Sequence, residues 1–231
     1  MELLECIHLN KSFGDKQVLQ DINLSIPRGK IIGLLGKNGT GKSTLIKMMN
    51  NLLTPTSGQV LVNGKEIGVE SKKIIAYLPE RSYLDKSMTV EKTLAFFEDF
   101  YENFDSEKAR KLLKDLDLDI TQKLSKMSKG MQEKVQLVLV MSRKADLYIL
   151  DEPLGGVDPA TRDYILDTIL YNFHNGASVL LSTHLISDIE KILDEVIFID
   201  KGKIILTDNA NALRERENAS IDEIFRRTFK C

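Results

Sequence analysis

The sequence predicts an α/β fold with a mainly parallel sheet, an antiparallel β subdomain and an α-helical insertion. Three observations lead to this prediction. A glycine-rich loop joins an apolar run to a helix-compatible run, apolar strands alternate with helical segments, and helical periodicity interrupts that alternation from about residue 90 to 142. We expect one domain over residues 1–231, with a helical subdomain at about 83–143.

The order of elements follows from apolar runs and turn residues. Strands are expected at 2–9, 18–26, 31–35, 59–62, 74–78, 147–150 and 179–182, and a hairpin over 196–206. Helices are expected at 43–50, from Pro159 onward, at 186–193 and at 220–230, and within the insertion Leu94, Phe97 and Tyr101 follow helical spacing. The amphipathic segment 220–230 either packs against the rest of the chain or binds a partner.

The segment 36–43 fits the phosphate-binding pattern Gly-x-x-x-x-Gly-Lys-Ser/Thr and lies between an apolar strand and a helix. Glycines let backbone N–H groups point at a phosphate, and the helix N-terminus adds partial positive charge. Lys42 can reach the β- and γ-phosphates, while the Ser43 hydroxyl can bind Mg²⁺. Glycine-rich turns also occur without a ligand, but in this context the motif predicts binding of a nucleoside triphosphate.

Two adjacent carboxylates, Asp151 and Glu152, follow the apolar run 147–150. In a nucleotide-binding sheet, such a strand lies beside the phosphate-loop strand and brings its end to the metal. Because successive side chains diverge, Asp151 can hold Mg²⁺ while Glu152 orients or deprotonates the attacking water. Taken alone, the pair could be solvated acids at the end of a strand. Beside a phosphate loop, the catalytic interpretation is favoured.

The bulk composition narrows the class of protein. The net charge of −2 argues against nucleic-acid binding as the main function, and no run approaches the length of about 20 apolar residues that spans a bilayer. The N-terminal residues do not resemble a signal peptide. Cys6 and Cys231 lie at opposite ends without metal-like spacing. We therefore expect an intracellular protein from a reducing compartment.

Ser128 and Gly130 stand at the start of a helical run. Alone, this is an ordinary helix N-cap. In order along the chain come the phosphate loop, the helical insertion, this segment, the paired acids, residues 155–158 and His184 after the next strand. That order resembles the ATPase subunit of ATP-binding cassette (ABC) transporters, and the resemblance covers essentially the whole chain.

The resemblance implies that two such domains pack head to tail around two Mg·ATP. Ser128 and Gly130 would contact the γ-phosphate of ATP bound by the partner, and His184 would meet the γ-phosphate and the attacking water beside Glu152 and Lys42. The residues that hold the phosphates in the same chain would be Gly36, Lys37, Asn38, Gly39, Thr40, Gly41, Lys42, Ser43 and Thr44.

Two further positions keep two interpretations each. Asp158 matches the loop that communicates between the two sites, and it is also a suitable N-cap before Pro159; both roles can hold together. Phe13 lies where the family places an aromatic ring that stacks on adenine, and a core phenylalanine is the alternative.

The sequence departs from the family pattern at three places. The family's common signature Leu-Ser-Gly-Gly-Gln is Met-Ser-Lys-Gly-Met over 127–131, so Lys129 adds a cation that either contacts the triphosphate or faces solvent. Glu80 replaces a glutamine and remains a hard oxygen ligand for Mg²⁺. Residues 155–156 are Gly-Gly in place of Ser-x. These departures resemble a bacterial group that includes exporters of amphipathic peptides, among them phenol-soluble-modulin exporters.

The resemblance therefore implies an ATPase subunit that is peripheral at the cytoplasmic face of the membrane, with a polytopic membrane subunit and a second ATPase subunit as partners. The membrane partner would contact residues near 80–104, a segment with six aromatic residues: Tyr83, Phe96, Phe97, Phe100, Tyr101 and Phe104. At least half of these side chains would be core, and the exposed ones would form the contact surface. The alternative is a soluble ABC-type ATPase of DNA repair or the ribosome. Long coiled coils and a second cassette, which mark those proteins, are not evident in the sequence.

Overall fold

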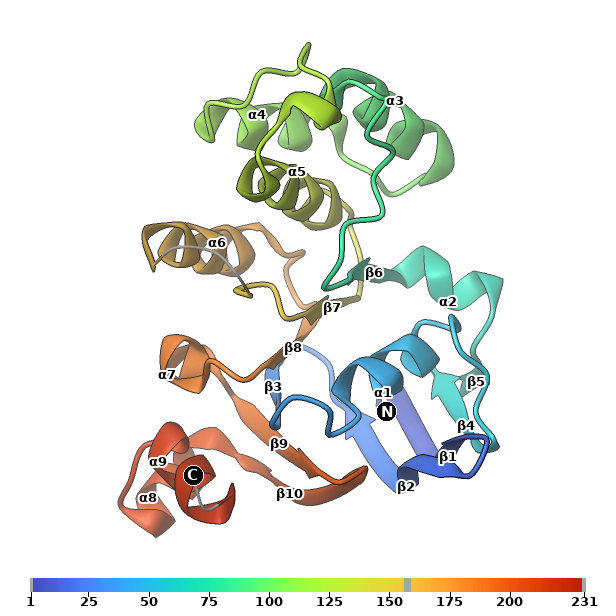
Figure 1. The fold of residues 1–231 in the computed structure, drawn as a ribbon, viewed down its shortest axis with the longest axis vertical. Helices are drawn as coiled ribbons and strands as arrows, with labels where there is room; N and C mark the ends of the chain where they lie inside the picture. Colours follow the sequence, from blue (N-terminus) through green and yellow to red (C-terminus); the bar gives the residue numbers. More distant parts are fainter. Residues whose placement is uncertain (1, 156–158, 230–231) are drawn as a thin grey trace.

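The computed structural model describes residues 2–155 and 159–229 as two sheets with helices around them (Figure 1). The strands are β1 (Leu4–Phe13), β2 (Lys16–Ile26), β3 (Ile31–Leu35), β4 (Ser57–Val62), β5 (Lys65–Glu66), β6 (Ile75–Leu78), β7 (Leu147–Asp151), β8 (Ser178–Thr183), β9 (Glu195–Asp200) and β10 (Lys203–Asn209). The helices are α1 (Lys42–Met49), α2 (Val69–Ile74), α3 (Val90–Phe100), α4 (Ser106–Asp115), α5 (Lys129–Met141), α6 (Pro159–Asn172), α7 (Ile186–Ile189), α8 (Ala210–Glu217) and α9 (Ile221–Phe229).

The larger sheet has the strand order β10-β9-β3-β8-β7-β6. All its neighbouring strands are parallel except the pair β9–β10, which forms the expected hairpin. Leu35 pairs with Thr183, and Asp151 pairs with Ser182, so β3, β8 and β7 end at the same edge. Parallel strands present their carboxyl ends together, which is where ligands bind in open α/β sheets. The prediction of a mainly parallel sheet is confirmed.

The smaller sheet is the expected antiparallel part, with the order β2-β1-β4-β5. Its inner face packs against the larger sheet and α1, and the shared core contains Leu9 and Ile22 from one sheet and Leu34 and Ile197 from the other. Because alternate side chains of a strand point to opposite faces, one face of β1 and β2 is buried while the other remains exposed. Because β3 and α1 both contribute side chains to this core, it fixes the two elements between which the glycine-rich loop runs.

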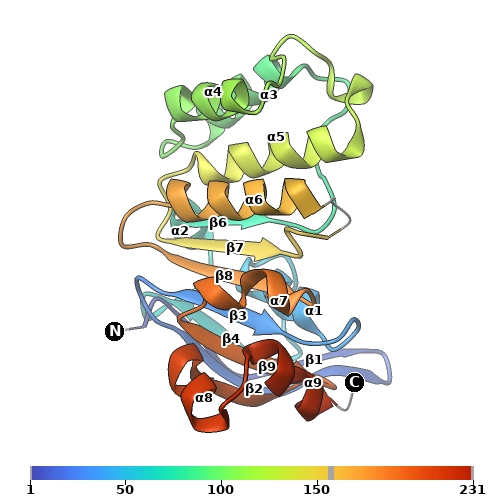
Figure 2. The ribbon, with the colours of Figure 1, turned by 90° about the vertical axis from the view of Figure 1, so that its left-hand side faces the viewer.

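Helices α3, α4 and α5 form a separate apolar cluster at the upper end of Figure 1. Helix α5 also contributes to the core that α6, α7 and α9 build against the larger sheet, and Figure 2 shows α5 and α6 stacked between that sheet and the upper helices. Phe97 is buried, and Tyr101 and Phe104 pack against the helical cluster. Phe96 and Phe100 are exposed, as is Tyr83. The expected division of these aromatic residues between core and surface is confirmed.

Short elements differ from the sequence expectations. Helix α2 ends at Ile74, so β6 begins one residue later than expected; α2, β5 and α8 were absent from the prediction. Helix α2 is too short to show a helical period in the sequence, and hydrogen bonds between Ser71 and the Gly68 backbone stabilise its start. The helix expected at 186–193 is α7 followed by a 3₁₀ turn, Glu190–Ile192. Helix α9 packs against the core, as one of its two interpretations predicted.

Arg143 joins the helical cluster to the edge of the larger sheet. Its guanidinium donates hydrogen bonds to the carbonyl of Ile75 at 2.7 Å and to those of Lys72 and Lys73 at 3.0 Å each, and Nε donates to the Asn103 side chain at 3.1 Å. Arg143 is only 5% exposed. Its donors therefore satisfy carbonyls at and just beyond the end of α2, where Asn103 Nδ2 also donates to the Lys73 carbonyl at 2.8 Å.

Arg143→Met is expected to lower the free energy of unfolding by about 3 kcal/mol, because buried carbonyls lose their donor. Urea denaturation measures this change. The matched control is Arg110→Met, since the Arg110 side chain is half exposed and lies on α4, and its effect should stay within about 0.5 kcal/mol. A loss below about 1 kcal/mol for Arg143→Met would contradict the assigned role.

Candidate functional site

The loop between β3 and α1 is tightly confined. A Cβ added to Gly36 would lie 2.6 Å from the carbonyl oxygen of Ile199, and one added to Gly41 would lie 2.7 Å from Leu19 Cδ2. Gly41 also has a φ of 110°, a conformation that favours glycine. The loop therefore needs glycine at both ends in order to turn from the strand into the N-terminus of α1. A glycine-rich turn into a helix N-terminus can present backbone N–H groups to a phosphate.

Lys42 is a buried cation at the first position of α1. Its Nζ donates to the carbonyls of Gly36 at 2.7 Å and Lys37 at 3.2 Å, and it lies 3.4 Å from Glu152 Oε1. An ammonium group that is 5% exposed requires such partners, because an unpaired buried charge is strongly destabilising. Phosphate oxygens can replace these partners when a nucleotide binds. The ammonium is thus held where a phosphate-binding loop requires it.

Asp151 ends β7 beside the start of α1. Its Oδ1 accepts a hydrogen bond from Ser182 at 2.5 Å and lies 3.4 Å from Ser43 Oγ. Burial raises the pKa of the Asp151 carboxyl, and the nearby carboxylates of Glu152 and Glu80 act in the same direction, whereas the two serine hydroxyls oppose the shift. A hydroxyl and a carboxylate oxygen at this spacing fit Mg²⁺, which takes one or two protein ligands together with phosphates and water.

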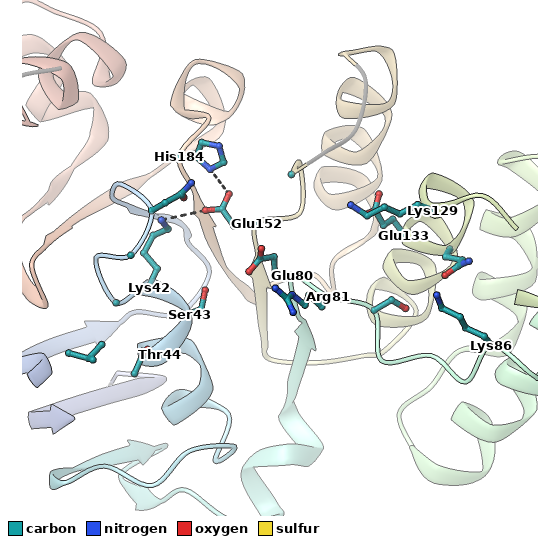
Figure 3. A pocket seen from close by; sticks show the side chains of 17 residues that line it. Lys42, Ser43, Thr44, Glu80, Arg81, Lys86, Lys129, Glu133, Glu152 and His184 are labelled. Carbon is teal, nitrogen blue, oxygen red and sulfur yellow. Dashed lines mark hydrogen bonds and ion pairs between the residues drawn. The ribbon is translucent and has the colours of Figure 1, made fainter. Parts of the chain in front are cut away.

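Glu152 has a backbone φ of 51°, which is uncommon for a residue other than glycine. Its N–H donates to the Ser182 carbonyl at 3.0 Å. The carboxylate lies between two partners, with Oε2 at 2.9 Å from His184 Nδ1 and Oε1 near Lys42, as Figure 3 shows. The Glu152 side chain is 11% exposed and the His184 side chain 42% exposed. Backbone strain of this kind occurs at functional sites, and here it aims a carboxylate at the phosphate loop.

Lys42, Glu152 and His184 line a cleft of about 820 Å³, whereas Asp151 lines a small separate pocket that shares Glu80 and Glu152 with it. One side carries the phosphate loop, Glu152 and His184, and the opposite side carries Lys129 and Glu133 from the start of α5 (Figure 3). Glu80 lies between the two sides at the end of β6. The complete lining is Val18, Asn38, Gly39, Gly41, Lys42, Ser43, Thr44, Glu80, Arg81, Ser82, Lys86, Lys129, Gln132, Glu133, Glu152, Gly155 and His184.

The structure separates some predicted site residues from the cleft. Phe13 is 51% exposed at the end of β1, where Lys11 Nζ lies 4.9 Å from its ring, and it does not line the cleft. It is not a core residue either. Val18 of β2 lines the cleft instead, although an apolar residue within a strand gives no sequence signal for such a role. Lys37 points its ammonium at the Phe229 carbonyl. Asp158 lies outside the described residues.

Other predicted site residues are buried within the phosphate loop or lie at the start of a helix. Gly36 and Thr40 are buried within the loop, where Thr40 Oγ1 donates to the Lys37 carbonyl at 2.9 Å. Ser128 is the N-cap of α5, accepting a hydrogen bond from Met131 N at 3.2 Å. A Cβ added to Gly130 would meet nothing within 4 Å. The signature segment is therefore an exposed helix start.

Lys129 also has a partner within its own chain. Its Nζ lies 3.4 Å from Glu133 Oε1, one turn further along α5. The Lys129 side chain is 80% exposed, so this ion pair contributes little to stability. The side chain can leave Glu133 for an anion at small cost. Sequence reasoning did not assign Arg81, Lys86 or Glu133 to the cleft, because their spacing matches no motif.

The comparison with known families agrees with this geometry. A family model described as "ABC transporter" matches residues 19–155, more than half of the chain. The chain belongs to the ABC transporter ATP-binding family. It is accordingly an ABC-type ATPase domain that binds and hydrolyses ATP. Among residues 2–155 and 159–229, the longest helices fall short of the length and apolarity required to cross a bilayer.

Similar proteins extend this assignment over nearly the whole chain. The lantibiotic transport ATP-binding protein SrtF of Streptococcus pyogenes is 30% identical over 224 residues, covering 95% of this chain and 97% of SrtF. The linearmycin resistance ATP-binding protein LnrL of Bacillus subtilis is 30% identical, covering 88% of this chain and 68% of LnrL. A solved ATP-binding subunit of an ABC transporter has a TM-score of 0.86 at 30% identity, with 96% of this chain and 98% of that chain covered.

Asp151→Asn is expected to stabilise the nucleotide-free protein in EDTA by about 1 kcal/mol at pH 8. An acid whose pKa is higher in the folded than in the unfolded chain destabilises the fold when ionised. This cost is absent below the unfolded-state pKa of about 4, so the advantage of the variant should disappear toward that pH. Urea denaturation at several pH values measures it. Asp99→Asn, at an exposed position of α3, is the control; lower stability of Asp151→Asn at pH 8 would contradict the prediction.

Glu152→Gln is expected to lower kcat about 100-fold or more, because the amide cannot accept a proton from water. The Kd for ATP should change less than about threefold, since the neutral side chain no longer competes for Lys42. Phosphate release and nucleotide binding by calorimetry give the two values. Glu98→Gln, at an exposed position of α3, is the matched control. Retained turnover in Glu152→Gln would remove this residue from the mechanism.

Proposed function

We propose that the chain powers a membrane ABC transporter that exports peptides or drugs. The single observation that supports ATP-driven function is that Lys42 and His184 both contact the Glu152 carboxylate at the cleft. Two relatives support export by their names, SrtF in lantibiotic transport and LnrL in linearmycin resistance. In this proposal the chain acts as one nucleotide-binding domain, with α3–α5 as its helical subdomain, at the cytoplasmic face of the membrane.

Hydrolysis in this proposal uses residues of the same chain. Lys42 leaves the carbonyls of Gly36 and Lys37 and donates to the β- and γ-phosphates, which frees Glu152 from its ion pair. Glu152 then accepts a proton from the attacking water. If Nδ1 of His184 carries the proton that bonds Glu152, its Nε2 is an acceptor that can take a hydrogen bond from the attacking water.

A divalent cation would be held by Ser43 and Asp151, with Glu80 supplying a further oxygen from the loop after β6. Mg²⁺ supplies charge neutralisation of the β- and γ-phosphates when it is bound. The carboxylate of Glu80 offers the same kind of oxygen as the family's glutamine, so this departure is compatible with metal binding. The raised pKa of the Asp151 carboxyl reflects a buried anion that a cation would stabilise.

The signature segment faces a second ATPase subunit in this proposal. Ser128 and Gly130 would approach the γ-phosphate of ATP bound by that subunit, because the helix start is exposed and a ligand can come close to Gly130. Lys129 would add a cation to the same contact. Asp158 would relay between the two sites. ATP then favours the closed pair, and hydrolysis favours separation.

The membrane subunit would contact α3. Phe96 and Phe100 are 53% and 67% exposed, and their rings stack at 5.9 Å with an interplanar angle of 15°. An exposed aromatic pair on a helix surface supports a protein contact, since isolated apolar residues are normal but paired rings form a patch. Tyr83, from the same part of the sequence, is also exposed.

Replacing both Phe96 and Phe100 with alanine is expected to abolish co-purification of a polytopic membrane protein from detergent-solubilised cells, while the Kd for ATP remains within about twofold. The control is Tyr171→Ala, because Tyr171 is 81% exposed on α6. Mass spectrometry identifies the captured subunit. A wild-type chain that captures ribosomes or DNA-repair proteins instead would contradict the transporter proposal.

A further inference from the structure

Lys37 is the phosphate-loop residue whose side chain turns away from the cleft. Its Nζ donates to the carbonyl oxygen of Phe229 at 2.9 Å and lies 5.9 Å from the centre of that ring. Phe229 is the last residue of α9, where carbonyl groups lack partners within the helix. A cation at a helix C-terminus is also favoured by the helix dipole. The contact therefore joins the phosphate loop to a segment 192 positions away.

Helix α9 offers a fixed support for this contact. Ile221, Ile224 and Phe225 are buried against the core of the larger sheet. The Phe225 ring meets the buried Phe198 of β9 edge to face at 5.4 Å, and it lies 4.1 Å from the Phe229 ring. At the other end, Glu190 Oε2 accepts a hydrogen bond from Asp222 N at 3.1 Å. Contacts at both ends of α9 thus fix the helix, and with it the position of the Phe229 carbonyl.

The backbone of Lys37 holds the catalytic lysine. The Lys37 carbonyl accepts hydrogen bonds from Lys42 Nζ at 3.2 Å and from Thr40 Oγ1 at 2.9 Å. A shift of Lys37 would therefore move the groups that position the Lys42 ammonium. Contacts run from α9 to the Lys37 side chain, and from the Lys37 carbonyl to Lys42. None of the cleft-lining residues belongs to α9.

We propose that Lys37 is a positioning residue and that α9, through the Phe229 carbonyl, preorganises the phosphate loop for ATP. A loop that is held in its binding conformation loses less entropy when the ligand arrives, so the contact acts on affinity rather than on the chemical step. The inference rests on ATP binding at this loop and is independent of transport. Its competitor is direct contact of the Lys37 ammonium with the nucleotide phosphates.

Lys37→Met tests the role of the Lys37 side chain, since it removes the ammonium and roughly keeps the length of the side chain. The expected result is a rise of about three- to tenfold in the KM for ATP, the effect of one lost charge-assisted hydrogen bond, with kcat within about twofold. Lys37→Arg should stay near wild type, because a guanidinium can donate to the same carbonyl. Lys47→Met is the matched control, at an exposed position of α1. An unchanged KM in Lys37→Met would overturn the proposal.

A double-mutant cycle separates the proposal from its competitor. Phe229→Ala removes the ring that packs the end of α9, and it should raise the KM for ATP although Phe229 lies outside the cleft. If α9 acts through Lys37, Lys37→Met combined with Phe229→Ala should show little more than the larger single effect. Additive effects, or an unchanged KM in Phe229→Ala, would overturn the proposal in favour of direct phosphate contact.

Folding and site controls complete the experiment. Urea denaturation should show that each variant unfolds in one cooperative transition, as the wild type does, and Arg227→Ala tests an exposed position on the same helix. A wild-type chain that fails to bind ATP would count against the phosphate-loop assignment, not against the role of α9. An increase in KM that is confined to the Lys37 and Phe229 variants supports the proposal.

Discussion

The shared edge of three neighbouring parallel strands is the constraint on which the site depends. Strands β3, β8 and β7 end there together: the phosphate loop follows β3, His184 follows β8, and β7 ends in Asp151 with Glu152 directly after it. Residues more than 100 positions apart thus meet within hydrogen-bond distance. The register of the sheet fixes these contacts, because a shift of one strand by one residue would turn its side chains to the opposite face of the sheet.

Charge balance sets the resting state of that edge. Lys42 is buried among two backbone carbonyls and Glu152, so its charge is compensated before a nucleotide arrives. The same ion pair engages the Glu152 carboxylate, so that this oxygen is not free to accept a proton from water. A triphosphate that takes over Lys42 thereby also releases the carboxylate toward His184 and water. In this account, binding and activation of the base are one electrostatic event.

Much of this site was predictable because its chemistry depends on local patterns. The phosphate loop, the acids after β7 and His184 each follow a strand, and a strand end is visible in sequence. Val18 was not predictable, because its place in the cleft depends on how two sheets pack. Phe13 is exposed and lies outside the lining of the cleft, and its stacking on adenine stays a prediction. The contact between Lys37 and Phe229 joins opposite ends of the chain and has no local signature.

A crystal structure of the Glu152→Gln variant with Mg·ATP would show whether the triphosphate displaces the resting partners of Lys42. We expect Lys42 Nζ to leave the carbonyls of Gly36 and Lys37 and to lie within hydrogen-bond distance of the β- and γ-phosphates, with the side chain at 152 facing the γ-phosphate. A structure in which ATP is bound while Lys42 keeps its carbonyl partners, or in which the triphosphate lies away from the loop, would contradict it.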